Sequence, residues 1–173
     1  MPRENTRIFR VKGFEEARLD SKDLDNLPII ITGSHDRLPP YTKQRYPGMT
    51  RRGLSLWKRQ VNRLQRYVEA AKDIGRRVHF ASEVIKYSDF RYFLRKNRAV
   101  EIVGGFSEWC VPLAIEEIVR RRKIALVNPA YTISGASELP ELHRGKIIIN
   151  YLLTENPDFN CYICGMDLIF SKR

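Results

Sequence analysis

The chain has 173 residues, of which 43% are hydrophobic and 29% charged, so it is long enough for one domain with a core and has the composition of a soluble globular protein. No apolar run approaches the ~20 residues that span a bilayer, and the first residues lack the apolar core of a signal peptide, which argues against a membrane or secreted protein. Three cysteines are too few for a disulfide framework and favour a reducing intracellular compartment, the cytoplasm or the mitochondrial matrix.

The net charge of +11 is concentrated in the middle of the sequence. Residues 37–99 contain 17 basic and 4 acidic side chains, whereas residues 1–36 contain 6 and 7, and residues 100–173 contain 8 and 9. Such a basic region favours association with an anionic partner: RNA, an acidic protein surface or a layer of phospholipid headgroups. The alternative is a solvated basic face without a dedicated partner.

The amino-terminal third contains one clear element. Residues 1–27 are polar, mixed in charge and weakly patterned, which indicates an extension that wraps a surface. Residues 27–34, with the sequence LPIIITGS, are typical of a short buried β-strand that ends at Gly33. Residues 37–50 contain three prolines and Gly48 and are therefore predicted to form a loop.

A helix is predicted to follow this loop. Its apolar residues recur at spacings of three and four and form one stripe: Leu54, Trp57, Val61, Leu64, Val68 and Ala71. Basic residues occupy the other faces, and Gly75 is expected to end the helix. The stripe is predicted to pack on a β-sheet, because a coiled coil would need more heptads.

Strands and helices alternate further along the chain. The predicted elements are strands at residues 78–82, 99–103 and 124–127 and helices at residues 88–96 and 108–122. This alternation predicts a three-layer α/β fold, with a mostly parallel sheet between helices on both faces, in a single domain of residues 28–173. Residues 146–153 and 162–170 are interpreted as two further strands, which could form an edge pair.

The most informative segment delivers Cys110 to a strand-to-helix junction. Gly104 and Gly105 follow the predicted strand, and Pro112 is tolerated only in the first turn of the helix. There the sulfur would lie among the N–H groups of the helix start, whose partial positive charge favours a thiolate. In a parallel sheet this carboxyl edge is also where ligands bind.

Residues 105–111 read GFSEWCV, and this Gly-x-x-x-x-Cys-Val segment resembles the isochorismatase-like cysteine hydrolases, a family that includes the nicotinamidases. The likeness covers residues 28–134: residues 64–80 are similar to the first helix and second strand of the family, and residues 123–130 to the strand after the cysteine helix. The resemblance implies the α/β fold of this family and a thiolate that attacks an amide or related carbon.

The resemblance also implies a catalytic set, in which an aspartate at the end of the first strand moves the proton, a lysine keeps the site electropositive and backbone N–H groups stabilise the oxyanion. These roles fall to Cys110 as nucleophile, Asp36 as base and Lys86 as electrostatic support. The first-strand position expected to carry the aspartate is Gly33, and Lys86 lies only 24 residues before Cys110. Cys110 is therefore either a nucleophile or a buried packing residue.

A second cysteine pattern concerns metal binding. Cys161 and Cys164 have the spacing of a zinc knuckle, but a structural zinc ion needs four ligands, so His143 or a neighbouring subunit would have to complete the site. Otherwise the two cysteines are packing residues. The metal-binding residues of the family have no counterpart beyond His35. We therefore predict no metal and no other cofactor.

The basic region carries the prediction of a partner. Basic and aromatic residues interleave there in a mixture suited to phosphate contact and base stacking. The candidate residues for contact with RNA or an acidic partner are Arg45, Arg51, Arg52, Lys58, Arg59 and Arg63. The sequence favours a divergent isochorismatase-like protein with decayed catalytic residues that serves as a structural or binding subunit of a larger assembly, with protein subunits, RNA or both as partners. The alternatives are an active cysteine hydrolase of a small amide and a free RNA-binding module.

Overall fold

The computed structural model describes residues 8–10, 19, 24, 27–32, 50–81, 94–134 and 139–173. The predicted loop at residues 37–50, apart from Thr50, and the predicted helix at residues 88–96, apart from its last three residues, lie outside these ranges. None of the helices in these ranges combines the length and the apolar character that crossing a lipid bilayer requires.

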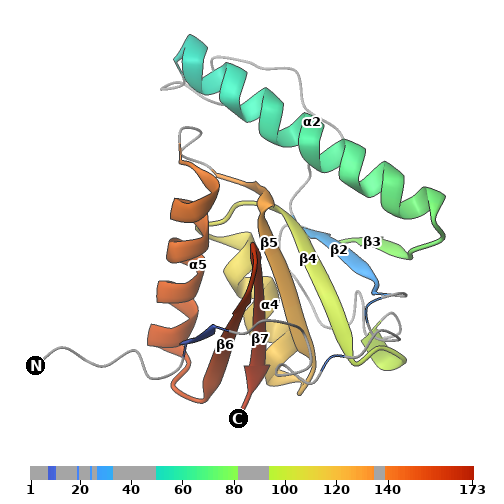
Figure 1. The fold of residues 1–173 in the computed structure, drawn as a ribbon, viewed down its shortest axis with the longest axis vertical. Helices are drawn as coiled ribbons and strands as arrows, with labels where there is room; N and C mark the ends of the chain where they lie inside the picture. The colour runs from blue at the N-terminus through green and yellow to red at the C-terminus, as the bar shows by residue number, and fades with distance from the viewer. Residues whose placement is uncertain are drawn as a thin grey trace, which may run out of the picture.

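A seven-stranded mixed sheet forms the centre of the described structure, with the strand order β1-β6-β7-β5-β4-β2-β3 (Figure 1). Its strands are β1 (Ile8–Arg10), β2 (Ile29–Thr32), β3 (Val78–Phe80), β4 (Ala99–Gly105), β5 (Ile124–Ile133), β6 (Phe159–Cys164) and β7 (Asp167–Lys172). β7 pairs antiparallel with β5 and β6, and the other described pairings are parallel. The prediction of a mostly parallel sheet in an α/β fold is therefore confirmed.

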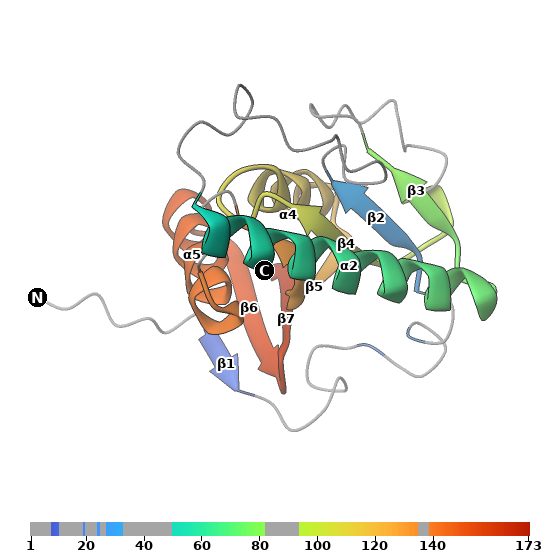
Figure 2. The ribbon, with the colours of Figure 1, turned by 90° about the horizontal axis from the view of Figure 1, so that it is seen from above.

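Helix α2 (Arg51–Asp73) crosses one face of the sheet near the carboxyl ends of the strands (Figures 1 and 2). The Gly53 N–H donates a 3.0 Å hydrogen bond to Oγ1 of Thr50, which caps the start of the helix. The predicted apolar stripe packs against β2, β4 and β5, and Trp57 within it is only 2% exposed. The helix ends just before Gly75, whose φ of +84° favours glycine. The prediction for this helix is confirmed.

Helices α4 (Cys110–Arg120) and α5 (Glu141–Glu155) cover the opposite face of the sheet. Side chains alternate along the strands between the two faces: in β4, Val100 and Ile102 pack with α4 and α5, whereas Val103 packs with α2. Because both faces are covered, β4 is buried along its whole length. The sheet therefore lies between α2 on one face and α4 with α5 on the other, and these are the three predicted layers.

The prediction of a strand at residues 146–153 is wrong, because these residues lie within α5. A run of three isoleucines indicated a buried strand, but the buried residues fall in pairs four positions apart, which is the helical period: Arg144 and Gly145, Ile148 and Ile149, Leu152 and Leu153. Residues 162–170 likewise do not form a single strand. They span the hairpin of β6 and β7, with Gly165 in the turn at a φ of +61°.

Parts of the predicted amino-terminal extension contact the domain. β1 adds an edge strand, in which Ile8 lies opposite Cys161 of β6. Leu19 is 2% exposed and shares a core cluster with Leu27 and with Ile124 at the start of β5. Leu19 and Leu27 lie toward the amino ends of β4 and β5, whereas α2 covers the carboxyl ends of β2, β4 and β5.

Candidate functional site

Cys110 is the first residue of α4 and follows the end of β4 after a short turn, as predicted. Its side chain is half-buried, whereas the side chain of Trp109 is 68% exposed. The peptide bond between Gly105 and Phe106 in this turn is cis. The Phe106 carbonyl accepts 3.0 Å hydrogen bonds from the N–H groups of Trp109 and Val111. The two backbone donors on either side of Cys110 are therefore engaged within the turn.

The other two predicted catalytic residues, Asp36 and Lys86, lie outside the described residues, so only Cys110 has a known position. The described end of β2 is Thr32, whose hydroxyl lies 3.2 Å from the Val103 carbonyl and 3.1 Å from that of Gly105. Gly104 opposite has a φ of +99°, and a Cβ there would lie 2.4 Å from the Thr32 carbonyl oxygen. The end of β2 is therefore packed tightly against β4, and only glycine fits at position 104.

A buried hydroxyl network lies beside this contact, where β5 bulges. Two steps along β4, from Ile102 to Gly104, match five steps along β5, from Val127 to Thr132. Pro129 lies in the bulge, and its lack of an N–H fits the break in strand pairing. The Ser107 hydroxyl donates to Oγ1 of Thr132 at 3.0 Å, and Thr132 donates to the Pro129 carbonyl at 2.9 Å.

Arg144 completes this network from the first turns of α5, although it is only 2% exposed. Its Nε and Nη2 donate to the Pro129 carbonyl at 3.2 and 2.9 Å, and its Nη1 donates to the Leu139 carbonyl at 2.5 Å. Burial lowers the pKa of this guanidinium, and the nearby charges of Glu141 and Glu108 partly oppose that shift. We call Ser107, Thr132, Arg144 and these two carbonyl groups the carboxyl-edge network. It joins β5 to α5.

Sequence reasoning missed the carboxyl-edge network. The available sequence signal was the helical spacing of the pairs that follow Arg144 and Gly145, namely Ile148 with Ile149 and Leu152 with Leu153. The isoleucine run was instead interpreted as a strand. A Cβ at position 145 would lie 3.2 Å from the ring of Pro129, so the glycine allows α5 to approach β5 closely. The bulge of β5 that brings these groups together leaves no clear pattern in the sequence.

A second buried charged cluster fixes the carboxyl-terminal end of α2 to the sheet. Arg76 Nη2 lies 2.6 Å from Oε2 of Glu101, the Tyr67 hydroxyl donates to the same carboxylate at 2.7 Å, and Arg76 Nε donates to the Leu27 carbonyl at 2.7 Å. Burial and the charge of Glu101 raise the pKa of Tyr67. The Tyr67 ring also stacks on Tyr131 of the bulge, with ring centroids 3.8 Å apart. Because these charged groups bind one another, we interpret the cluster as structural.

The basic residues predicted to contact a partner are exposed on α2: Arg51, Arg52, Lys58, Arg59 and Arg63. Arg45 lies outside the described residues. Four arginines at spacings of seven, four and three form a single row opposite the buried stripe: Arg52, Arg59, Arg63 and Arg66. We call them the α2 arginine row. Arg63 also pairs with Glu141 at the start of α5, and this hydrogen bond lowers the pKa of Glu141.

Cys161 and Cys164 lie on opposite faces of β6. Cys161 is fully buried in the core under α4 and α5, and burial raises the pKa of its thiol to about 12. Cys164, three residues further along the strand, packs on the other face with Leu126 and Ile169. Two sulfur atoms on opposite faces of a strand cannot grip one ion, so the zinc-knuckle interpretation is wrong for this pair.

The described carboxyl edge therefore brings one half-buried thiol to the start of a helix. The hydroxyl, carbonyl and guanidinium groups of the carboxyl-edge network bind one another. The α2 arginine row lies on a different surface, along the helix face opposite the buried stripe. Comparison of the chain with models of known protein families, with curated proteins and with solved structures finds no match.

Proposed function

We propose that this protein is a non-catalytic binding subunit of a larger assembly, a divergent relative of the isochorismatase-like cysteine hydrolases that contacts an anionic partner through the basic face of α2. The observation that carries this proposal is the division of α2 into two faces. Trp57, Val61 and Leu64 are buried against the chain's own sheet, while the α2 arginine row is exposed on the other side, with Arg63 also paired to Glu141. A helix whose apolar face is already packed is left with its charged face for a partner.

The geometry of the row supports an extended anionic partner. A helix rises about 1.5 Å per residue, so the 14 steps from Arg52 to Arg66 span about 20 Å. The two acidic residues of α2, Glu69 and Asp73, come after this segment. Exposed arginines along a straight rod suit the phosphates of RNA or a row of carboxylates. RNA is the favoured partner, because a row of arginines of this length can contact several phosphates along one strand.

Two observations support the loss of hydrolase activity. The N–H groups of Trp109 and Val111, which flank Cys110, are engaged with the Phe106 carbonyl and are not turned toward an oxyanion. The resemblance puts an aspartate at the end of the first strand, where the sequence has Gly33 directly after the buried Thr32. With these two flanking N–H groups engaged and glycine in place of the expected aspartate, Cys110 is better explained as a packing residue than as a nucleophile.

The test is native mass measurement of the full chain purified from its source cells. We expect the wild-type chain in a complex and the charge-reversed variant Arg52→Glu, Arg59→Glu, Arg66→Glu as a free chain. The matched control reverses three exposed charges elsewhere on the surface: Arg95→Glu, Lys96→Glu and Lys146→Glu. It has the same net charge as the row variant and should stay in the complex.

Treatment with nuclease and competition by excess RNA then identify the partner. If either releases the wild-type chain, the row binds RNA. If neither does and the row variant still dissociates, the partner is an acidic protein surface. The proposal is contradicted if the native mass of the wild type is that of a single free chain. It is also contradicted if the control variant leaves the complex as the row variant does.

An active cysteine hydrolase of a small amide is the second candidate, and the position of Cys110 at the first residue of α4 favours it. Alkylation by iodoacetamide at neutral pH, followed by mass spectrometry, separates the two. A packing cysteine should react no faster than a free small-molecule thiol such as glutathione. Faster alkylation of Cys110 than of glutathione would support the hydrolase. Cys161 is no fair reference, because its burial alone protects it.

A further inference from the structure

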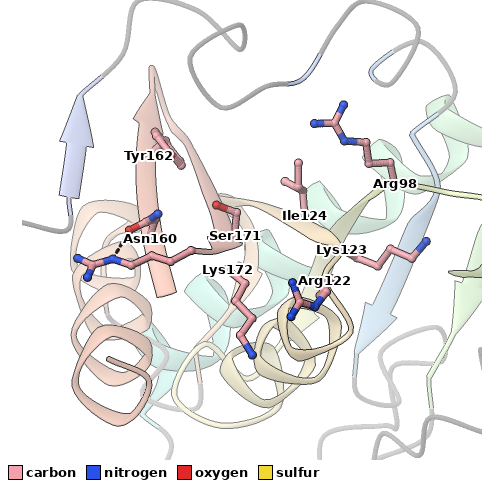
Figure 3. A pocket seen from close by; sticks show the side chains of 9 residues that line it. Arg98, Arg122, Lys123, Ile124, Asn160, Tyr162, Ser171 and Lys172 are labelled. Carbon is pink, nitrogen blue, oxygen red and sulfur yellow. Dashed lines mark hydrogen bonds between the residues drawn. The ribbon is translucent and has the colours of Figure 1, made fainter. Parts of the chain in front are cut away.

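A basic hollow of about 310 Å³ opens at the amino ends of β4 and β5 (Figure 3). Five cationic side chains line it: Arg98, Arg122, Lys123, Lys172 and Arg173. The other four lining residues are Ile124, Asn160, Tyr162 and Ser171. We call the site formed by these nine residues the basic hollow. None of the nine is acidic.

The topology of the sheet explains why these cations meet. Arg98 precedes β4, and Arg122 and Lys123 join α4 to β5. Lys172 and Arg173 reach the same edge because β7 runs antiparallel to β5 and ends where β5 begins. Four of the five therefore come from residues 100–173, a part of the sequence whose net charge is −1.

The charge of the basic hollow favours an anionic ligand. Lys172 pairs at 3.3 Å with Asp158, which is not among the nine lining residues, and Arg173 Nε donates to Asn160 Oδ1 at 3.4 Å. The nine lining residues contribute five positive charges and no negative charge. Like charges closer together than the Debye length, about 8 Å at physiological salt, repel one another, so an anion in such a site is stabilised by each cation within that distance.

The floor of the hollow adds a second kind of recognition. Ile124, Asn160, Tyr162 and Ser171 lie across neighbouring strands, and the cationic side chains of Arg98, Lys123, Arg122 and Lys172 stand around them (Figure 3). Asn160 and Ser171 are direct cross-strand partners, so an amide and a hydroxyl lie next to each other beside the Tyr162 ring. An aromatic ring with amide and hydroxyl groups suits the stacking and edge hydrogen bonding of a nucleobase.

From these observations we propose that the basic hollow binds a nucleoside phosphate, with the phosphate held by Arg122, Lys123 and their cationic neighbours and the base held near Tyr162. Its volume is at the small end of ligand sites and fits a single nucleotide. The nucleotide is either free or part of a single strand of RNA. This site does not include the α2 arginine row, and so it extends the proposed function without depending on it.

The experiment measures binding to the full chain with three probes: ATP, inorganic phosphate and a fluorescein-labelled single-stranded uridine decamer. The hollow variant is Arg122→Asn with Lys123→Gln. Asparagine is chosen because Arg122 has a φ of +59°, which asparagine tolerates well. The matched control is Arg59→Gln with Arg66→Gln, which removes two cations from the α2 arginine row. Thermal unfolding checks that both variants fold.

We expect the hollow variant to bind ATP about tenfold or more weakly than the wild type, because two charge-assisted contacts are lost, and the row variant to bind ATP within about twofold of the wild type. Inorganic phosphate should bind more weakly than ATP, since it lacks the base and also has less negative charge. Tyr162→Leu should also weaken ATP binding and leave phosphate binding unchanged. If the decamer binds through the hollow and ATP does not, the nucleotide belongs to RNA and the proposal stands.

Three results overturn the proposal: no probe binds, phosphate binds as tightly as ATP, or ATP and the decamer lose affinity only in the row variant. The third result would leave the proposed function of α2 intact. If the row variant leaves the assembly but binds ATP as tightly as the wild type does, the α2 arginine row and the basic hollow are two independent sites. If polyglutamate displaces ATP from the hollow and binds as tightly as ATP does, the ligand is an acidic peptide and the proposal is also overturned.

Discussion

At the carboxyl edge of the sheet, Ser107, Thr132 and Arg144 bond to one another and to backbone carbonyls, whereas at the amino edge Arg122 and Lys123 stand beside an open hollow. Parallel α/β sheets usually bind ligands at the carboxyl edge. In the described part of this chain that edge is consolidated by internal hydrogen bonds, and the charged recess lies at the other end. Topology therefore indicates at which edge of a sheet a ligand can bind. Whether a ligand can bind there also depends on whether the polar groups at that edge are already hydrogen-bonded within the protein.

The strongest way to break the carboxyl edge is Gly104→Ala. Its Cβ would meet the Thr32 carbonyl at 2.4 Å in a backbone conformation with φ at +99°, so β2 and β4 would have to separate. We expect the free energy of unfolding to fall by about 4 kcal/mol or more, measured by urea denaturation. Gly75→Ala is the control, because its φ of +84° is similar but no atom lies within 4 Å of the Cβ; it should cost about 1–2 kcal/mol. Equal costs would show that the close approach of β2 and β4 is not important.

The second prediction concerns α2, which covers the carboxyl ends of the strands. Trp57→Ala should lower the free energy of unfolding by about 3–5 kcal/mol, because Trp57 is 2% exposed and its removal leaves a large cavity against β2, β4 and β5. Lys58→Ala, on the exposed side of the same turn, should change it by less than about 0.5 kcal/mol. A small effect of the tryptophan substitution would mean that α2 does not depend on its contact with the sheet.

The third prediction compares the two edges directly. Arg144→Met keeps much of the side-chain length but removes the donors to Pro129 and Leu139, so buried carbonyls lose their partners and stability should fall by about 2–4 kcal/mol. The hollow variant, Arg122→Asn with Lys123→Gln, should change stability by less than about 0.5 kcal/mol. If the hollow variant lowers the free energy of unfolding as much as Arg144→Met does, the cations of the amino edge are structural as well, and the two edges do not differ in the way described.

The smallest expected effect is a pH dependence at Asp167. Burial raises the pKa of this carboxyl above its ordinary value, although it accepts a 3.1 Å hydrogen bond from Asn128. A raised pKa means that the folded state binds the proton more tightly than the unfolded state, so this group favours folding at acidic pH and loses that contribution as the pH rises through the raised pKa. Asp167→Asn should therefore be more stable than the wild type near neutral pH, and the difference should shrink toward about pH 4. A difference that does not vary with pH would contradict this assignment.

Sequence patterns predicted those parts of the fold that depend on local periodicity. The stripe of α2 was correct because its spacing admits only one buried face, and the junction at Cys110 was correct because glycines end β4 and Pro112 fits the first turn of a helix. Residues 146–153 were mistaken for a strand because a short apolar run has no period of its own. Only the structure shows which of these residues are buried, because the burial comes from contacts with α4 and β5.

The candidate sites divide in the same way. Periodicity and charge counting along the chain were enough to predict the exposed arginines of α2, because a helix face is a local property. The carboxyl-edge network needed the bulge of β5, which brings Ser107, Thr132 and Arg144 together across 37 positions of sequence. The basic hollow needed β7 to run antiparallel, so that Lys172 and Arg173 meet Arg98, Arg122 and Lys123. By itself the sequence determined which residues are charged and which face of α2 is buried, and only the tertiary structure decided which charges share a site, because strand order and direction are set by long-range packing.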